Sequence, residues 1–334
     1  MTGRESHTWA ILAGILLLAL GLRLVNLSGR TLWYDEAFAV LFAEKGWGAM
    51  VDGTLTPVDG GSADVHPLLY YTTLNVWMEV FGQGAAAVRL YSVVIGVATV
   101  FAVFVLARDW FGDRTALVAA FITAVAPFHV QYSQEARMYA LLALVLVLTT
   151  WTYWRAWQRG QPHYWLAFGV LAGVAMYVQQ LAATYLLALG LLPFLARDRA
   201  RIVRTVLASL VSLVIYLPWM LYLPDQLGKL RQYWVQKPNV LHLWLALRTF
   251  ISVNLDFSRA WWLPTFLMAA VLTVLLLYRG SVVLRRMRCD NADRQPVGWA
   301  LWLAFVPMIL MWVASFVFQP MFLPRALLPS AEIF

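Results

Sequence analysis

Charged residues are what this sequence has least of. Only 13% of the 334 residues are charged, whereas 62% are hydrophobic. Soluble domains carry about 25% charged residues. The apolar residues also stand in long runs rather than at amphipathic spacing, so the composition excludes a soluble globular domain and predicts an all-α polytopic membrane protein.

Cysteine is almost absent as well, and the single Cys289 excludes any disulfide within the chain. It lies in an arginine-rich stretch that we expect to be a cytoplasmic loop, where a thiol stays reduced. The net charge of +8 would suit nucleic acid. Most arginines, however, stand in short segments between apolar runs, so we expect no nucleic-acid partner. No small-residue cleavage site follows the first run, which we therefore interpret as a retained helix.

Nine apolar runs approach the length of about 20 residues that a spanning helix needs. They are 9–26, 88–106, 115–131, 137–154, 164–179, 181–195, 203–221, 262–279 and 298–318. Four of the connections between them are rich in arginine, and such loops stay in the cytoplasm. Their arginines are Arg108 and Arg114; Arg155 and Arg159; Arg197, Arg199, Arg201 and Arg204; and Arg279, Arg285, Arg286, Arg288 and Arg294.

Alternation of these runs predicts one domain, 1–334, in the cell (inner) membrane with a cytoplasmic N-terminus. The segments 27–87, 132–136, 222–261 and 319–334 are then extracytoplasmic. This parity requires that 67–81 does not span, and we interpret it as a helix lying on the outer surface. If 67–81 does span, the sidedness of everything up to residue 131 changes.

The predicted first outer segment, 27–87, is too long for a simple connector, and long ordered loops are usually functional. Its stretch 35–50 is amphipathic, and the Gly- and Asp-rich stretch 51–64 could act as a lid. Seven of the 17 acidic residues fall in this segment: Asp35, Glu36, Glu44, Asp52, Asp59, Asp64 and Glu79. We therefore expect an acidic outer site carried by interfacial helices.

Three polar motifs are predicted on this same face. They are DE at 35–36, VHPLLYY at 65–71 and YSQEARMY at 132–139. Each has an ordinary structural alternative: acids complementing a helix dipole, a turn before a helix, and an ion pair between Glu135 and Arg137. Arg89, at the start of a span, could snorkel to the headgroups. Together, acids, a histidine, arginines and tyrosines at one membrane surface indicate a reaction site.

The order of these motifs resembles the membrane glycosyltransferases of the GT-C fold. The motifs in order are DEA, HPLLYY, AVRLYSVVIGV, SQEARMYALL, YLPWM at 216–220 and LPRALLP at 323–329. The branch most similar is that of bacterial relatives of dolichyl-phosphate-mannose protein mannosyltransferases and of aminoarabinose transferases acting on lipid A. The chain has one proline at Pro67 where the family usually has two, and Arg325-Ala326 where it often has Arg-Tyr. It also stops soon after the late motif, so we expect a short form or a fragment.

The resemblance implies transfer of a sugar from a polyprenyl-phosphate donor to a hydroxyl acceptor outside the membrane. Direct attack would invert the anomeric centre. A carboxylate base serves such an attack, and the family pattern gives this role to Asp35, with Glu36 orienting the acceptor or the loop and Glu135 as second acid. Arginines bind phosphate in a fork. The residues expected to bind the donor phosphate or sugar are His66, Arg89, Arg137, Tyr70, Tyr139 and Arg325.

Two questions stay open at this level. The acids and His66 could hold a divalent metal, but no zinc-like spacing is present, and we expect no obligatory cofactor. The main rival function is a transporter or flippase of a lipid-linked sugar. Such proteins place charges near the bilayer midplane on broken helices, whereas these runs have few charges inside them. The donor sugar and the acceptor cannot be inferred.

Overall fold

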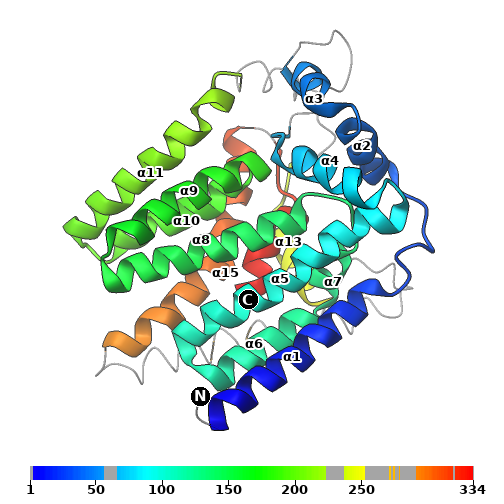
Figure 1. Ribbon diagram of the computed structural model, residues 1–334. Coiled ribbons are helices and arrows are strands. Elements are labelled where there is room, and N and C mark those ends of the chain that lie inside the picture. The colour runs from blue at the N-terminus through cyan, green and yellow to red at the C-terminus, as the bar shows by residue number, and fades with distance from the viewer. Residues whose placement is uncertain are drawn as a thin grey trace.

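A computed structural model describes residues 3–55, 66–222, 237–252, 291–318 and 320–333, together with 271, 274 and 278. These residues form helices joined by turns, without a strand among them (Figure 1). The all-α prediction is therefore confirmed.

Eight of the nine predicted spans coincide with helices. The helices are α1 (Gly3–Leu24), α5 (Ala85–Phe111), α8 (Tyr139–Arg159), α9 (Pro162–Val178), α10 (Ala182–Leu195), α11 (Arg199–Met220) and α15 (Asn291–Val317), with α6 (Asp113–Val125) and α7 (Pro127–Ser133) together covering the one run 115–131. The ninth, 262–279, falls almost wholly outside the described residues. Within the described ranges, five helices are long and apolar enough to cross a bilayer singly, and α6 with α7 makes a sixth span if the bent pair counts as one.

The run 115–131, predicted as one span, is a bent pair instead. Helices α6 and α7 meet at 60°. The break lies at Ala126, whose backbone is not helical (φ −59°, ψ 120°), and Pro127 then opens α7. Proline has no N–H to donate to the preceding turn, so the chain bends there rather than continuing straight. The bend carries α7 towards the C-terminal segment.

Three short helices stand between the first two spans: α2 (Tyr34–Ala43), α3 (Gly46–Leu55) and α4 (Leu69–Phe81). The predicted amphipathic stretch 35–50 is thus two helices broken after α2. At 1.5 Å per residue, the 13 residues of α4 reach about 20 Å, well short of the hydrocarbon core. This length supports the interpretation of 67–81 as a helix that does not span. Most of the lid stretch 51–64 lies outside the described residues.

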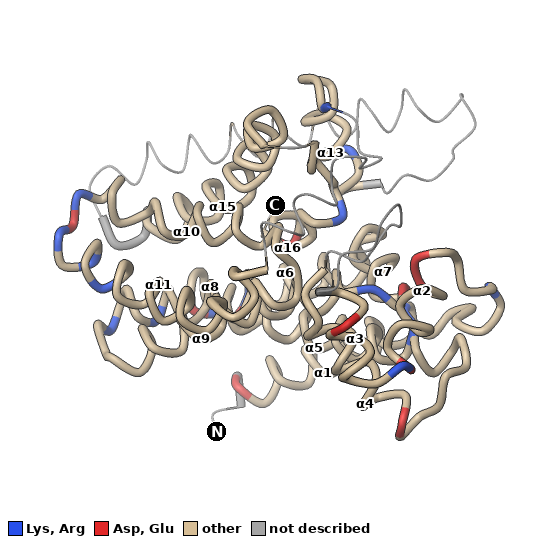
Figure 2. Tube along the Cα trace, turned by 90° about the horizontal axis from the view of Figure 1, so that it is seen from above, with Lys and Arg blue, Asp and Glu red and all other residues tan. Residues whose placement is uncertain are grey.

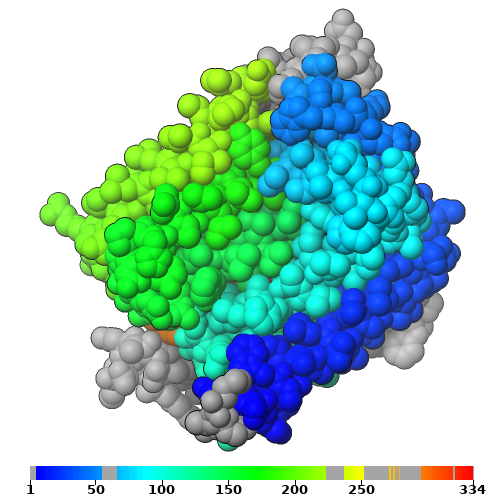
Figure 3. Space-filling model, in the orientation of Figure 1, coloured from blue at the N-terminus to red at the C-terminus, as the bar shows by residue number. Residues whose placement is uncertain are grey.

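A helix that the sequence did not predict, α13 (Val240–Ser252), lies in the segment 222–261. It packs against α7 and α15, and against the terminal elements η3 (Pro324–Leu327) and α16 (Leu328–Ile333). Figure 2 shows α10, α13 and α15 in one row and α1, α5, α8, α9 and α11 in another, with α16 between the rows. On the face in Figure 3, blue α1 lies at the lower right and yellow-green α11 at the upper left, with cyan and green helices between them, and the blue α2 and α3 lie at the upper right.

Small residues let two of these helices approach closely. A Cβ added to Gly169 of α9 would lie 2.5 Å from the carbonyl oxygen of Ala208 on α11, and one added to Gly173 would lie 2.9 Å from Ile215. A pair of glycines four residues apart is a common way for membrane helices to pack backbone against backbone. Here it joins α9 to α11.

The arginine-rich connections that the structure describes gather at one end of the bundle. The guanidinium of Arg108 lies 5.5 Å from the ring of Trp9, and that of Arg201 lies 4.3 Å from the ring of Trp157. Arg155 pairs with Asp109 at 2.5 Å. Helices α2, α3 and α4 lie at the other end (Figures 1 and 2). The basic loops and the acidic segment are therefore separated by the length of the bundle.

Candidate functional site

Glu36, in the first turn of α2, is the centre of a buried cluster. Its side chain is 1% exposed and accepts from Arg89 Nε at 2.9 Å and from Arg89 Nη2 at 2.6 Å. The backbone N–H of Ala136 donates to Oε1 at 3.0 Å, and that of Trp33 donates to Oε2 at 3.3 Å. One carboxylate thus ties together α2, α5 and the turn that precedes α8.

Arg89 completes this cluster from the α5 side. Besides Glu36, its guanidinium donates to the carbonyl oxygens of Leu27 at 2.7 Å, Arg30 at 2.8 Å and Thr31 at 3.0 Å. A guanidinium has five N–H groups, and all five find acceptors within the chain. We had predicted that Arg89 binds the donor phosphate, but no N–H remains for it. The snorkelling alternative does not fit either, because the residue is 1% exposed.

The charge state of Glu36 agrees with a structural position. Burial opposes ionisation of its carboxyl, but the hydrogen bonds from Arg89 and Ala136 outweigh burial and lower its pKa. Of the two roles that we predicted for Glu36, orienting the loop agrees with this geometry. Orienting an acceptor would need a carboxylate less enclosed than this one.

Asp35 lies beside this cluster and is only partly buried. Its Oδ2 is 3.4 Å from Nη1 of Arg325, and its backbone carbonyl accepts from Nη1 of Arg137 at 3.3 Å. The ion pair with Arg325 is partly open, with side-chain exposures of 23% and 18%. The structure thus brings the predicted base together with two predicted phosphate-binding arginines, which stand 102 and 290 positions further along the chain.

Tyrosine rings pack next to the Arg325 guanidinium. The guanidinium lies 5.3 Å from the ring centroid of Tyr139, the first residue of α8. The ring of Tyr132, on α7, meets Tyr139 edge to face at 5.3 Å. A cation held over an aromatic face keeps its N–H groups at the rim, where they can reach an anion.

Glu135 lies in the turn between α7 and α8. The residue is 8% exposed, and its carboxylate accepts from Nε2 of Gln131 at 3.2 Å. Burial raises its pKa, and the negative charge of Glu36 adds to the rise, partly offset by Gln131 and by the charge of Arg325. The second predicted acid therefore lies within electrostatic reach of the Asp35 cluster and holds its proton more readily than an exposed glutamate.

In the HPLLYY motif, the position of Tyr70 near the buried cluster is clearer than that of His66. Tyr70 is 1% exposed, and burial is the main reason that its pKa is raised well above the usual value, with Arg137 acting in the opposite direction. Tyr70 is thus buried close to the cluster. His66 is half-buried at the start of the described segment, three residues before α4.

Metal binding receives no support from the ranges that the structure describes. Among them, no group of three or more His, Cys, Asp or Glu side chains is arranged to hold a metal ion. We expected no obligatory metal, and that expectation remains a prediction.

One buried polar group was missed from the sequence. Arg23, His129 and Glu332 are joined in the bundle interior: Arg23 is 0% exposed, and the side chains of His129 and Glu332 are 3% and 1% exposed. The signal available was an arginine at the end of the first run and a histidine inside the run 115–131. This signal is weak, because polar residues at helix ends are common.

Comparison with known proteins shows what this chain is similar to. Residues 65–222 match the family model described as dolichyl-phosphate-mannose-protein mannosyltransferase. A Bacillus subtilis protein named as a mannosyltransferase, YkcB, is 28% identical over 50% of this chain and 24% of its own length. An undecaprenyl phosphate-alpha-4-amino-4-deoxy-L-arabinose arabinosyl transferase of Pseudomonas aeruginosa is 26% identical over 96% of this chain and 59% of its own.

The fold is also that of a solved structure. ArnT from Cupriavidus metallidurans, bound to undecaprenyl phosphate, superposes with a TM-score of 0.66 at 21% identity, over 97% of this chain and 58% of that one. The chain thus spans less than two thirds of these relatives. The predicted resemblance is confirmed: this is a membrane protein with the GT-C fold, and it is similar in sequence to the glycosyltransferases built on that fold.

Proposed function

We propose that this protein transfers a sugar from a polyprenyl-phosphate donor to a hydroxyl acceptor on the extracytoplasmic side of the membrane. The observation that carries the proposal is the contact of Asp35 with both Arg137 and Arg325 at one end of a GT-C bundle. A carboxylate beside two guanidiniums suits a reaction in which a proton leaves an alcohol and a phosphate departs as an anion.

The proposed reaction is a single displacement. The acceptor oxygen attacks the anomeric carbon while the bond from that carbon to the phosphate oxygen breaks. The hydroxyl proton passes to the Asp35 carboxylate, and the bonding electrons leave with the polyprenyl phosphate. Because attack and departure occur on opposite faces of the sugar, the anomeric configuration inverts.

Arg325 is the principal phosphate ligand in this proposal. Its pair with Asp35 is long and partly exposed, so an arriving phosphate can replace Asp35 as its partner. The carboxylate is then released from its cation at the moment when a base is needed. Arg137, which donates to the Asp35 backbone, is close enough to share the phosphate charge.

Glu135 is assigned a different part. Because burial raises the pKa of Glu135, its carboxyl keeps its proton to a higher pH than an exposed glutamate does. A carboxyl that keeps its proton can donate a hydrogen bond to the sugar or to the phosphate. Tyr70 and Tyr139 supply ring surface near the same position, and His66 stays a candidate for binding the sugar.

The sidedness is supported by the separation of charges along the bundle. The arginine-rich turns with their aromatic partners lie at the end that holds the start of α1, and the Asp35 cluster lies at the other. Basic loops stay in the cytoplasm, so the site would face outward. A transporter would share the helices and arginines but would not need Asp35 as a base.

The test is mass spectrometry of envelope lipids, glycans and proteins from cells with wild-type protein, with Asp35→Asn, or with none. We expect one sugar-bearing species to be lost in both the null and the Asp35→Asn strains, with the variant still present in the membrane at wild-type amount. The control Asp109→Asn lies at the opposite end of the bundle and should keep the product. Wild-type product from Asp35→Asn would remove Asp35 from the base role.

A further inference from the structure

A buried chain of three side chains joins the first and last helices of the described structure. Arg23, in the last turn of α1, lies with Nη2 2.5 Å from Nδ1 of His129. Its Nη1 donates to the carbonyl oxygens of Ala19 at 3.0 Å and Ala124 at 2.9 Å. Because a guanidinium can only donate, Nδ1 of His129 accepts, and the imidazole proton of the neutral ring resides on Nε2.

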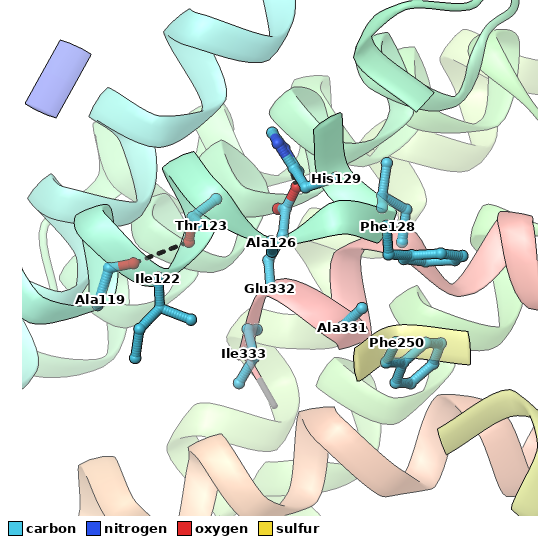
Figure 4. A pocket seen from close by; sticks show the side chains of 11 residues that line it. Ala119, Ile122, Thr123, Ala126, Phe128, His129, Phe250, Ala331, Glu332 and Ile333 are labelled. Atoms are coloured by element: carbon cyan, nitrogen blue, oxygen red, sulfur yellow. Dashed lines mark hydrogen bonds and ion pairs between the residues drawn. The ribbon is translucent and has the colours of Figure 1, made fainter. Parts of the chain in front are cut away.

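The other ring nitrogen lies against the C-terminal helix. Nε2 of His129 lies 2.7 Å from Oε1 of Glu332 on α16. Figure 4 shows the His129 and Glu332 side chains pointing toward one another. A neutral imidazole between a guanidinium and a carboxylate leaves the trio without net charge, which is the form in which ionised groups are tolerated in a low-dielectric interior. We call these three residues the clasp.

The clasp holds the segment that carries Arg325. Glu332 lies seven residues after Arg325, and η3 runs directly into α16. Arg325's own pair with Asp35 is long and partly exposed, and such pairs contribute little to holding a backbone in place. The buried contact at Glu332 therefore determines the position of Arg325 at the other end of this segment.

Side-chain packing alone leaves one side of α16 incomplete. A pocket of about 160 Å³ lies between α16, α13 and the α6–α7 bend (Figure 4). Phe128, Phe250 and Leu328 are among its lining residues, together with His129 and Glu332. Since close packing is missing there, the 2.7 Å contact between His129 and Glu332 carries more of the positioning on this side.

The Arg23–His129 part of the clasp lies next to the turn that holds Arg137. One turn beyond His129, the hydroxyl of Ser133 donates to the His129 carbonyl at 2.7 Å. A Cβ added to Gly96 of α5 would lie 2.2 Å from Ser133 Oγ and 3.2 Å from Arg23 Nε. The clasp is thus seated against α5 at a point where only glycine fits, directly before the turn 134–138.

We propose that Arg23, His129 and Glu332 are positioning residues that set Arg325 against the Asp35–Arg137 side of the site. In the described residues, no hydrogen bond or ion pair joins Arg23, His129 or Glu332 to Asp35 or Arg325. The three residues therefore act through the backbone of η3 and α16 and through the turn after α7. The expected effect on donor binding rests on the proposed function, whereas the expected effect on the position of α16 does not.

The test has two arms on full-length protein in detergent. In a Cys289→Ser background, Ser330→Cys places a thiol on α16 at a position with 0% exposure. The first arm measures the rate of maleimide labelling of that thiol, with and without Glu332→Gln. We expect the labelling rate to rise at least about tenfold when the carboxylate is lost, because α16 is released.

The second arm measures the Kd for undecaprenyl phosphate. Glu332→Gln should weaken binding by about tenfold to a hundredfold, since displacement of a binding group by about 1 Å has effects of that size. Tyr153→Phe is the matched control, because it removes another buried inter-helix hydrogen bond, to Thr205 at 2.9 Å. It should leave both the labelling rate and the Kd unchanged.

If Glu332→Gln does not fold, Glu332→Asp keeps the charge and shortens the reach by one methylene, and is expected to change both measurements in the same direction. Labelling of Ser330→Cys as slow as in the parent would overturn the clasp. Faster labelling with an unchanged Kd would overturn its role in positioning Arg325. A parent protein that does not bind undecaprenyl phosphate would count against the proposed function, while the labelling arm would still decide whether the clasp holds α16.

Discussion

At the scale of single residues, adjacent carboxylates in one motif have unlike surroundings. Glu36 is enclosed by Arg89 and two backbone N–H groups, whereas Asp35 meets Arg325 at 3.4 Å and stays partly open. A proton acceptor must be reachable by the alcohol that it deprotonates. The exposure of each carboxylate, rather than its residue type, therefore separates the candidate base from the structural acid.

Arg325 and Arg137 can be distinguished by substitution. We expect Arg325→Ala to weaken binding of undecaprenyl phosphate by about tenfold to a hundredfold, the effect of losing a hydrogen bond to a charged group. Arg325→Lys should recover part of the loss, because the charge remains while the fork is gone. The measurement is Kd by titration in detergent. Arg159→Ala, at the basic end, is the control, and an unchanged Kd for Arg325→Ala would contradict the assignment.

At the scale of elements, one buried pair fixes how the first outer segment sits on the bundle. Arg89 on α5 binds carbonyls between α1 and α2, and Glu36 binds the backbone of the turn before α8. Removing one partner of a buried pair leaves the other charge uncompensated. The outer segment should therefore depend on this pair for stability as well as for the placement of Asp35.

Glu36→Gln should lower the free energy of unfolding by about 3–5 kcal/mol near pH 7. The pKa of Glu36 is lowered in the folded state, so its stabilisation is present above the usual value of 4.5 and is lost as the pH falls through the folded value. The difference in melting temperature between wild type and Glu36→Gln should therefore shrink as the pH is lowered below 4.5. Glu79→Gln, on the exposed side of α4, is the control. A difference that does not change with pH would show that the Glu36 carboxylate is not the source.

At the scale of the whole molecule, the charge distribution predicts which end faces out. The Arg–Trp contacts gather at one end and the carboxylates of α2 to α4 at the other. Tryptophan and arginine together are typical of an interface next to the cytoplasm. The GT-C bundle would therefore hold its reaction site outside.

Thiol labelling tests that orientation. In a Cys289→Ser background, Glu79→Cys should react with a membrane-impermeant maleimide added to cells with an intact inner membrane, and Arg159→Cys should react only after the membrane is opened. Both positions are exposed, so accessibility within the protein is matched. The reverse pattern would invert the predicted topology.

The sequence by itself determined the class of protein, the places of most spans and the motifs that form the site. Run length and residue order are local properties, and a run of about 20 apolar residues must be buried in lipid whatever its neighbours are. The same reasoning predicts that Asp35, Arg137 and Arg325 lie on one face of the membrane. It did not find α13, and it interpreted the bent pair α6–α7 as one straight span.

Only the tertiary structure decided what each polar residue does. Arg89 looked free to bind phosphate until its five N–H groups were seen to have acceptors in the chain, and His129 drew no notice until Arg23 and Glu332 lay on either side of it. A hydrogen bond is directional and short in range. Its partner, here up to 290 positions away, cannot be inferred from a one-dimensional pattern, because the pattern records which groups must be satisfied but not which group satisfies them.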